Sequence, residues 1–320
     1  MDLSAFKIEP MGYDKLFSLG LVLFFTISML VASFLSRRVF LLASGFGAFI
    51  QAVYLLVRPD LALTDVAQLF EKNVTFDGVH LHIARSCAAV LLVEAVMLYR
   101  LSDRDSDPTI FTSIVWSRVV VYVLSTVNFV YSYLKGSHPK SKSGSLWTHD
   151  DLMLYLMGVA LMVEIFGGLF QLIRVSSWGG YPETFTRLNL HVRLDYIFVL
   201  LSGIATFALP HWFLSLETTV EKPGMLHLYL LRVTGILFIG SGLLMGRSPN
   251  FLRDNDKVTL LECRIVQNLL LILLQLYAQN WYSVFTNMHA FLGMGGVAVW
   301  TINAALGYWS VRGYPKLHAN

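Results

Sequence analysis

Charged residues are scarce in this chain and make up 14% of its 320 residues. A soluble globular protein carries about 25% charged residues, because its surface must face water. Here 55% of the residues are hydrophobic, and the mean hydropathy is +0.59. The net charge of +3 is spread through short loops and forms no basic cluster, so we expect no nucleic-acid partner. The composition excludes an ordinary soluble domain.

Cysteine is also rare, and both cysteines, Cys87 and Cys263, fall inside apolar runs. This excludes a disulfide framework and a cysteine-based metal site. The sequence contains no nucleotide-binding loop, zinc-protease motif or nucleophile elbow. A haem held by His191 and His289 is geometrically conceivable, but no second pair at matching positions supports it. We therefore expect no catalytic residue, no metal and no cofactor, with a haem or sterol-type enzyme as a remote alternative.

Long apolar runs are abundant. A transmembrane helix needs about 20 apolar residues to cross roughly 30 Å of hydrocarbon, and backbone groups in lipid must be bonded within their own segment. The sequence therefore predicts an all-α, polytopic integral membrane protein of about nine transmembrane helices, with the lipid bilayer as its first partner. The nine runs are Phe17–Leu35, Val39–Val57, Val79–Leu98, Phe111–Leu134, Leu152–Ile173, His191–Leu209, Leu226–Met245, Val258–Tyr277 and Val284–Trp309.

The order of these runs indicates an internal repeat. The stretch from His227 to Arg232 resembles the stretch from His80 to Arg85, and both ends are 147 positions apart. The pairs Arg118 and Arg264, Tyr131 and Tyr277, and Pro59 and Pro210 recur at offsets of 146, 146 and 151. The pattern predicts a first helix within residues 1–35, then two four-helix repeats over residues 36–180 and 181–320. Because four is even, both repeats have the same orientation, related by an axis near the membrane normal.

The orientation follows from the loop charges. Eleven Lys and Arg residues lie on one face of the alternating nine-helix path and eight on the other. The positive-inside rule then predicts an outer or lumenal N-terminus and a cytoplasmic C-terminus, in the endoplasmic reticulum or the plasma membrane. The sequon at Asn73 falls on the predicted outer face, which predicts a glycoprotein.

Charged and polar residues inside the predicted helices are the candidate site. A charge in hydrocarbon costs at least about 2.5–3.5 kcal/mol and is normally paired or faces the bundle interior. We expect Arg85 and Arg118 to occupy places matching those of Arg232 and Arg264. Each arginine should meet an acid or helix-end carbonyls, and such residues either hold helices together or line a pathway. The candidate residues are Arg85, Glu94, Arg118, Glu164, His191, Arg193, Asp195, Arg232, Glu262 and Arg264.

Gly242 and Gly246 form a GxxxG motif in one predicted helix. Small residues at this spacing let two helices approach closely. The sequence predicts a helix-packing site there, either within the chain or between two copies.

The second repeat carries short motifs of a known family. Pro210 ends a helix, Arg232 and Gly235 form an Arg-x-x-Gly helix, and Thr259-Leu260-Leu261 is followed by Glu262. This order resembles the p53-inducible protein eleven family of four-helix membrane proteins and, more distantly, the DoxX-like proteins. The resemblance implies a four-helix unit with a cytoplasmic C-terminus and no enzymatic mechanism. Some DoxX-like proteins assist the assembly of other membrane proteins.

Two functions fit these observations. The first is a non-catalytic accessory, assembly or scaffold subunit that acts through helix contacts with other membrane protein subunits. The alternative is a binder or transporter of a lipid-like or small polar ligand between the two repeats. That alternative requires a cavity that reaches Arg85 or Arg232.

Overall fold

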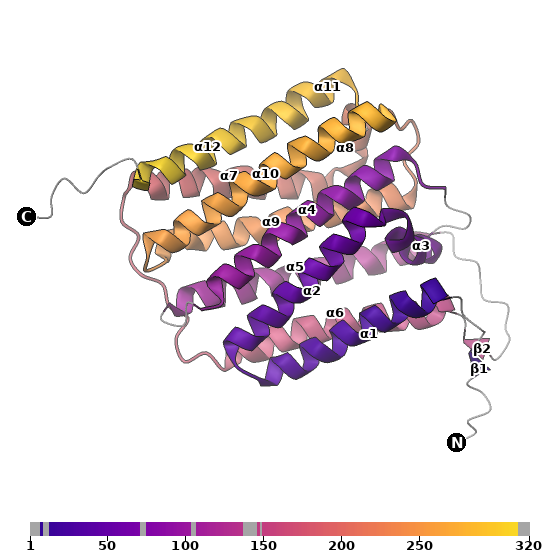
Figure 1. The fold of residues 1–320 in the computed structure, drawn as a ribbon, viewed down its shortest axis with the longest axis horizontal. Helices are drawn as coiled ribbons and strands as arrows, with labels where there is room; N and C mark the ends of the chain where they lie inside the picture. Colours follow the sequence, from indigo (N-terminus) through magenta and orange to yellow (C-terminus); the bar gives the residue numbers. More distant parts are fainter. Residues whose placement is uncertain are drawn as a thin grey trace, which may run out of the picture.

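The computed structural model describes residues 7–8, 13–70, 75–103, 107–136, 146–147 and 149–312, so the predicted glycosylation site at Asn73 lies outside the described residues. Helices dominate the described chain (Figure 1). The elements are β1 (Lys7–Ile8), α1 (Tyr13–Phe34), α2 (Arg37–Val57), α3 (Pro59–Phe70), α4 (Gly78–Leu101), α5 (Pro108–Lys135), β2 (Leu146–Trp147), α6 (His149–Ile173), α7 (Arg187–Ala208), α8 (Pro210–Glu217), α9 (Met225–Arg247), the 3-10 turn η2 (Ser248–Asn250), α10 (Asp254–Tyr282), α11 (Asn287–His289), the π-helix η3 (Ala290–Met294) and α12 (Gly295–Arg312).

Nine helices within the described residues are long and apolar enough to cross a membrane. This confirms the all-helical class and the expected number of long apolar helices. They are Lys15–Phe34, Arg37–Val57, Gly78–Leu101, Pro108–Lys135, Leu152–Ile173, Arg187–Ala208, Met225–Asn250, Asp254–Tyr282 and Asn287–Val311. β1 and β2 form one short parallel pair.

Two prolines mark where the chain turns after α2 and α7. Pro59 and Pro210 are the first residues of the short helices α3 and α8, the position where a missing N–H costs nothing. Helix α3 buries Leu63, Ala67 and Phe70 against the bundle. It packs against α2, α4, α5 and α6 and covers one end of them.

The long helices pack in a regular pattern. Helix α2 packs against α4, and α7 packs against α9. Helix α4 also packs against α10, and α5 packs against α9, so each half of the chain lends helices to the other. The halves differ at their edges: α12 packs against α10 and α7, whereas α6 packs against α5 and α1. In Figure 1, α1 begins near α3, and α12 ends at the opposite end of the bundle.

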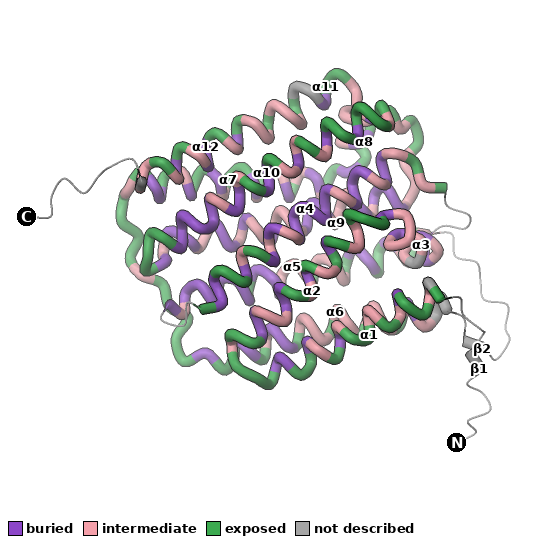
Figure 2. Tube along the Cα trace, viewed as in Figure 1, coloured by how far each residue is buried: buried purple, intermediate pink, exposed green. Residues whose placement is uncertain are grey.

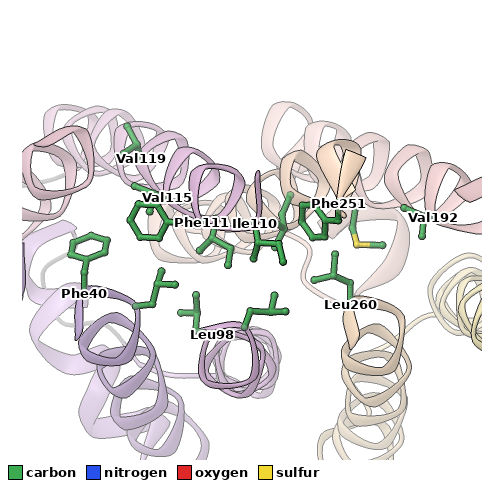
Figure 3. Packing of buried hydrophobic residues seen from close by; sticks show 14 of the residues in the cluster. Phe40, Leu98, Ile110, Phe111, Val115, Val119, Val192, Phe251 and Leu260 are labelled. Carbon is green, nitrogen blue, oxygen red and sulfur yellow. The ribbon is translucent and has the colours of Figure 1, made fainter. Parts of the chain in front are cut away.

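Buried apolar side chains form a large cluster at each end of the bundle. One joins α1, α2, α4, α5 and α6 to α7, α9, α10 and α12 through residues that include Phe40, Leu98 and Leu261. Figure 3 shows Phe111 on the side of Phe40 and Ile110 on the side of Phe251 in this cluster. The other lies beneath α3 and α8. Figure 2 shows burial concentrated along α4, α9 and α10, while α1, α6 and α12 expose much of their length.

Glycines set the close approach of α7 and α9. A Cβ atom on Gly203 would lie 2.7 Å from the backbone nitrogen of Ile239, and one on Gly235 would lie 2.6 Å from that of Phe207. Gly242 and Gly246 continue this contact, because Cβ atoms there would meet Leu200 at 3.1 Å and the Tyr196 ring at 2.9 Å. The GxxxG motif therefore packs within the chain, against α7.

Gly203→Val should force α7 away from α9, because its Cβ atom would have to displace backbone atoms. We expect a loss of stability of about 1–3 kcal/mol, the usual cost of overpacking a close contact. The measurement is the thermal unfolding midpoint of the full chain in detergent.

Gly296→Val is the matched control, because a Cβ at this α12 glycine meets nothing within 4 Å. Its midpoint should stay close to that of the wild type. Equal midpoints for both variants would contradict a backbone contact at Gly203.

Candidate functional site

The ten candidate residues do not form one cluster. They divide into a centre around Arg264, a centre around Arg118, two arginine–tyrosine contacts, and three pairs near helix ends.

The Arg264 centre lies between α7, α9, α10 and α12. The Nε of Arg264 donates to Asp195 Oδ2 at 3.2 Å, and its Nη2 donates to Ser241 Oγ at 2.6 Å. Its Nη1 donates to Gln267 at 3.0 Å, while Trp300 donates to the other Asp195 oxygen and lies under the guanidinium at 4.6 Å. The side chains of Arg264 and Asp195 are 3% and 0% exposed. A pair this deep is held by several hydrogen bonds at once, which offset the desolvation of both charges.

The Arg118 centre lies between α4, α5 and α6. Arg118 donates to Glu94 of α4 and to the hydroxyl of Tyr122 one turn later on α5. Glu164 of α6 is hydrogen-bonded to the same hydroxyl and lies in the field of Arg118. The acid partner expected for Arg118 is therefore present, and both Glu94 and Glu164 surround one guanidinium.

The two centres use different positions for their acids. Glu94 and Ser241 are 147 positions apart, and each bonds the buried arginine of its own half. Asp195 lies 151 positions after Ser44, the offset that also separates Pro59 and Pro210. Ser44 is buried, and its hydroxyl has no hydrogen-bond partner among the described residues. One half thus has an acid on α4 and a serine on α2, whereas the other has a serine on α9 and an acid on α7.

Arg85 and Arg232 contact tyrosines instead of the acids or carbonyls expected from the sequence. The Nη1 of Arg85 donates to the Tyr282 hydroxyl at 3.4 Å, and its guanidinium lies 5.2 Å from the Tyr277 ring. Arg232 lies 4.9 Å from the Tyr131 ring, and its Nη1 has no partner. Tyr131 and Tyr277 are 146 positions apart. Each arginine therefore stacks on the tyrosine of the opposite half, and the exchange ties the halves together.

Arg193 and Glu262 form partly exposed ion pairs. Arg193 is partly exposed and bonds Glu183 in the segment before α7, and this bond lowers the pKa of Glu183. Glu262 accepts from Arg100 at 2.6 Å and links α10 to α4. Both pairs join elements at the rim of the bundle, where an exposed ion pair contributes little stability.

His191 bonds Asn303 of α12 twice, with 3.0 Å between its Nδ1 and the amide oxygen. His289 lies fourteen positions before Asn303 and bonds Glu217 at 3.0 Å. Fourteen helical residues span about 20 Å, so the two histidines cannot share one iron. The haem alternative built on this pair is wrong.

Asp77 joins two stacked histidines at the starts of α4 and α9. The rings of His80 and His227 are 3.5 Å apart and tilted by 32°, and they too are 147 positions apart. Asp77 caps α4 through the His80 amide at 2.9 Å and bonds His227 Nε2 at 3.0 Å. Burial raises the pKa of the Asp77 carboxyl, but the hydrogen bonds from His227 and His80 outweigh it and hold this pKa well below its usual range.

These three side chains have the composition of a metal site. Imidazole lone pairs lie in the ring plane. Stacked rings direct them side by side and not toward one ion. In addition, the Nδ1 of His227 accepts from the Gly224 amide at 3.3 Å, so its Nε2 carries the proton donated to Asp77. The geometry therefore fits a hydrogen-bonded link between the first turns of α4 and α9 better than a metal site.

An apolar cleft with a volume of about 980 Å³ runs along α6. Its walls are α6, the last turns of α1 and the second half of α5. It lies at the edge of the first half, and neither Arg85 nor Arg232 lines it. The space therefore differs in place from the ligand cavity that the sequence suggested between the halves.

Comparison with known proteins adds one relationship. The profile of the family described as "Domain of unknown function (DUF8292)" matches residues 42–309. The chain belongs to the DUF8292 family. No curated protein and no solved structure matches it.

Several residues of this DUF8292 chain were missed by sequence reasoning. Tyr122, Ser241 and Trp300 complete the arginine centres, and their neutral side chains carry no pattern that marks them. Tyr131 and Tyr277 were visible as a pair at one offset, but nothing in the spacing assigned them to the arginines of the other half. Asp77 has the signal of an N-cap residue before an apolar run.

Asp195→Ser should leave Arg264 as a buried charge without a counter-charge. We expect a loss of about 3–5 kcal/mol in the free energy of unfolding, the usual cost of breaking a buried pair. Adding Ser241→Glu places an acid where the first half has Glu94. The double variant should recover most of the loss, as measured by thermal unfolding of the full chain in detergent.

Ser241→Glu alone is the control, because it brings a second carboxylate next to Asp195 and should destabilise the fold. The cycle of four proteins then gives a favourable coupling between positions 195 and 241. A double variant no more stable than Asp195→Ser would refute the equivalence of the two acid positions.

Proposed function

We propose that this chain is a non-catalytic integral membrane protein that acts through helix contacts, as an accessory, assembly or scaffold subunit of a membrane complex. The observation that carries the proposal is the state of the intramembrane charges. Arg85, Arg118 and Arg264 each donate hydrogen bonds to residues of neighbouring helices. Arg232 stacks on the ring of Tyr131 in α5. Arginines with such contacts hold neighbouring helices together. This supports a structural role for them over a role in lining a transport pathway.

The outer surface supports the same proposal. Large apolar side chains are exposed along α1, α6, α7 and α12, with Phe166 at 60% and Ile302 at 59%. In a bilayer this surface meets lipid or the helices of another protein. Between helices in lipid, association rests on packing and on a few polar contacts.

The proposal includes an architecture: one leading helix followed by two four-helix repeats of the same orientation, with domains at 1–35, 36–180 and 181–320. Three observations support the repeat. The α2–α4 and α7–α9 packings match, and α4–α10 matches α5–α9. Residues 147 positions apart meet each other at His80 and His227, and again at Cys87 and Thr234, whose sulfur and oxygen are 3.2 Å apart. When two repeats are related by a twofold axis, equivalent residues that lie close to the axis contact each other.

The proposal also keeps the expected orientation, with an outer or lumenal N-terminus, a cytoplasmic C-terminus and a glycan at Asn73. The membrane is that of the endoplasmic reticulum or the cell surface. The relationship to the p53-inducible protein eleven family belongs to the proposal as well, because it accounts for a four-helix unit with a cytoplasmic C-terminus.

Purification of the full tagged chain in a mild detergent, after cross-linking in its native membrane, tests the function. We expect one membrane polypeptide to co-purify at a fixed ratio, because an accessory subunit is held by a specific helix contact. The measurement is quantitative mass spectrometry of the eluted polypeptides.

The Gly203→Val variant is the control for specificity, since a disturbed bundle should lose the partner while staying in the membrane. A chain that elutes without any polypeptide at a fixed ratio, and carries a bound small molecule instead, would refute the proposal.

A further inference from the structure

The cleft along α6 has few polar groups in its walls. The hydroxyl groups of its serine and its threonine are already used, because Ser33 donates to Met29 at 2.7 Å and Thr126 donates to Tyr122 at 2.8 Å, both within their own helices. The rest of the lining is almost wholly hydrocarbon. At Gly158 a Cβ atom would meet nothing within 4 Å. The chemistry of the walls therefore selects a hydrocarbon occupant.

A fixed cation stands at one end of this cleft. Arg174 follows α6 directly, and its Nη1 donates to the carbonyls of Phe34 at 3.4 Å and Leu35 at 3.3 Å. Its guanidinium lies 5.5 Å from the Phe170 ring, which lines the cleft together with Phe34. Among the described residues no carboxylate pairs with Arg174, and its Nε and Nη2 have no hydrogen-bond partner. These free donors lie at the mouth of an apolar space.

The end that holds Arg174 is rich in cations. Arg37 and Arg38 begin α2 there, and Arg38 is already paired with Asp103 at 2.8 Å. The opposite end of the cleft lies near Leu154 and Tyr155. Between the two ends, Leu154 and Ile173 are about 28 Å apart along α6, close to the thickness of the hydrocarbon core. The cleft is thus apolar along its length, and Arg174 lies next to one end of it.

We propose that this cleft is a binding site for an anionic glycerophospholipid. One acyl chain lies against α1 and α6 in the half of the cleft next to Arg174, and the phosphate accepts hydrogen bonds from the free nitrogens of that arginine. Guanidinium groups bind phosphate through two parallel hydrogen bonds. Basic residues between transmembrane helices at the membrane surface are known to hold lipid head groups. The site belongs to the leaflet at the Arg174 end.

The free donors of Arg174 beside an apolar space favour a lipid over a partner helix. A spanning helix would meet apolar walls along its full length and would have no use for one phosphate-binding cation at the edge. An amphiphile with one anionic head matches both features at once. The proposal does not depend on the accessory function, because a lipid and a partner polypeptide are detected separately.

Native mass spectrometry of the full chain in detergent tests the site. The probes are phosphatidylglycerol and phosphatidylcholine with identical palmitoyl and oleoyl chains. We expect one phosphatidylglycerol to be retained, with about tenfold higher affinity than phosphatidylcholine, because charge-assisted hydrogen bonds to Arg174 add to the apolar contact. Arg174→Gln should reduce the affinity for phosphatidylglycerol to that for phosphatidylcholine, whereas Arg174→Lys should keep most of the preference.

A second pair of variants tests the apolar part. Leu30 lines the cleft and is 47% exposed, whereas Leu23 lies two turns earlier on α1, is 46% exposed and does not line it. Leu30→Trp should fill the cleft and weaken both lipids about fivefold or more. Leu23→Trp should bind as the wild type does, and so should Arg38→Gln, which removes a cation that is already paired.

Three results would overturn the proposal: no preference for the anionic lipid in the wild type, an unchanged preference in Arg174→Gln, or wild-type lipid binding in Leu30→Trp. If Leu30→Trp instead releases a co-purified polypeptide while lipid binding is unchanged, the cleft belongs to a partner helix and the lipid site is refuted. If Leu30→Trp fails to fold, the Arg174→Gln and Arg174→Lys pair decides alone.

Discussion

A guanidinium group held inside an apolar bundle constrains everything around it. It cannot lose its charge, and its donors must be satisfied by groups that the fold brings to it. Arg264 is the clearest case: four helices supply its neighbours, because Asp195 comes from α7, Ser241 from α9, Gln267 from its own α10, and Trp300 from α12. If any of these helices shifted, a buried donor would lose its partner. The polar centre therefore fixes the relative positions of helices whose apolar faces alone would tolerate sliding.

The first half satisfies the same constraint with a different residue set. Arg118 has its acid on α4, where the second half has a serine, and Ser44 of α2 occupies the place that corresponds to Asp195. The constraint is that one counter-charge reaches the arginine, and it leaves open which helix carries it. The additional acid Glu164 makes the Arg118 centre richer in carboxylates than the Arg264 centre. Each centre thus has a buried arginine paired with an acid from a neighbouring helix, but the two centres differ in their number of carboxylates.

Much of this could be predicted from the sequence, and what could not has a physical cause. Run lengths gave the nine long helices, because the bilayer thickness sets them. The cost of buried charge predicted that Arg118 meets an acid or helix-end carbonyls, with Glu94 and Glu164 among the few acids in the apolar runs. The tyrosine partners of Arg85 and Arg232 could not be predicted, because in lipid both faces of a helix are apolar and periodicity does not say which helix lies beside it. The contact of Gly203 with α9 was missed for the same reason, since a lone glycine has no pattern.

The difference between the edges of the two halves follows from α1. Helix α12 lies against α7, and α1 takes the corresponding place beside α6. Gly167 lets α6 approach Ser33 of α1 closely, since a Cβ atom there would lie 2.2 Å from the serine hydroxyl. Helix α1 meets α6 through its last turns in the cleft wall, and α5 closes the cleft at the other end. Helix α1 thus borders the cleft beside α6, and it places the carbonyls of Phe34 and Leu35 where they orient Arg174. The position of α1 therefore accounts both for the different helix neighbours of α6 and α12 and for the orientation of Arg174 at the mouth of the cleft.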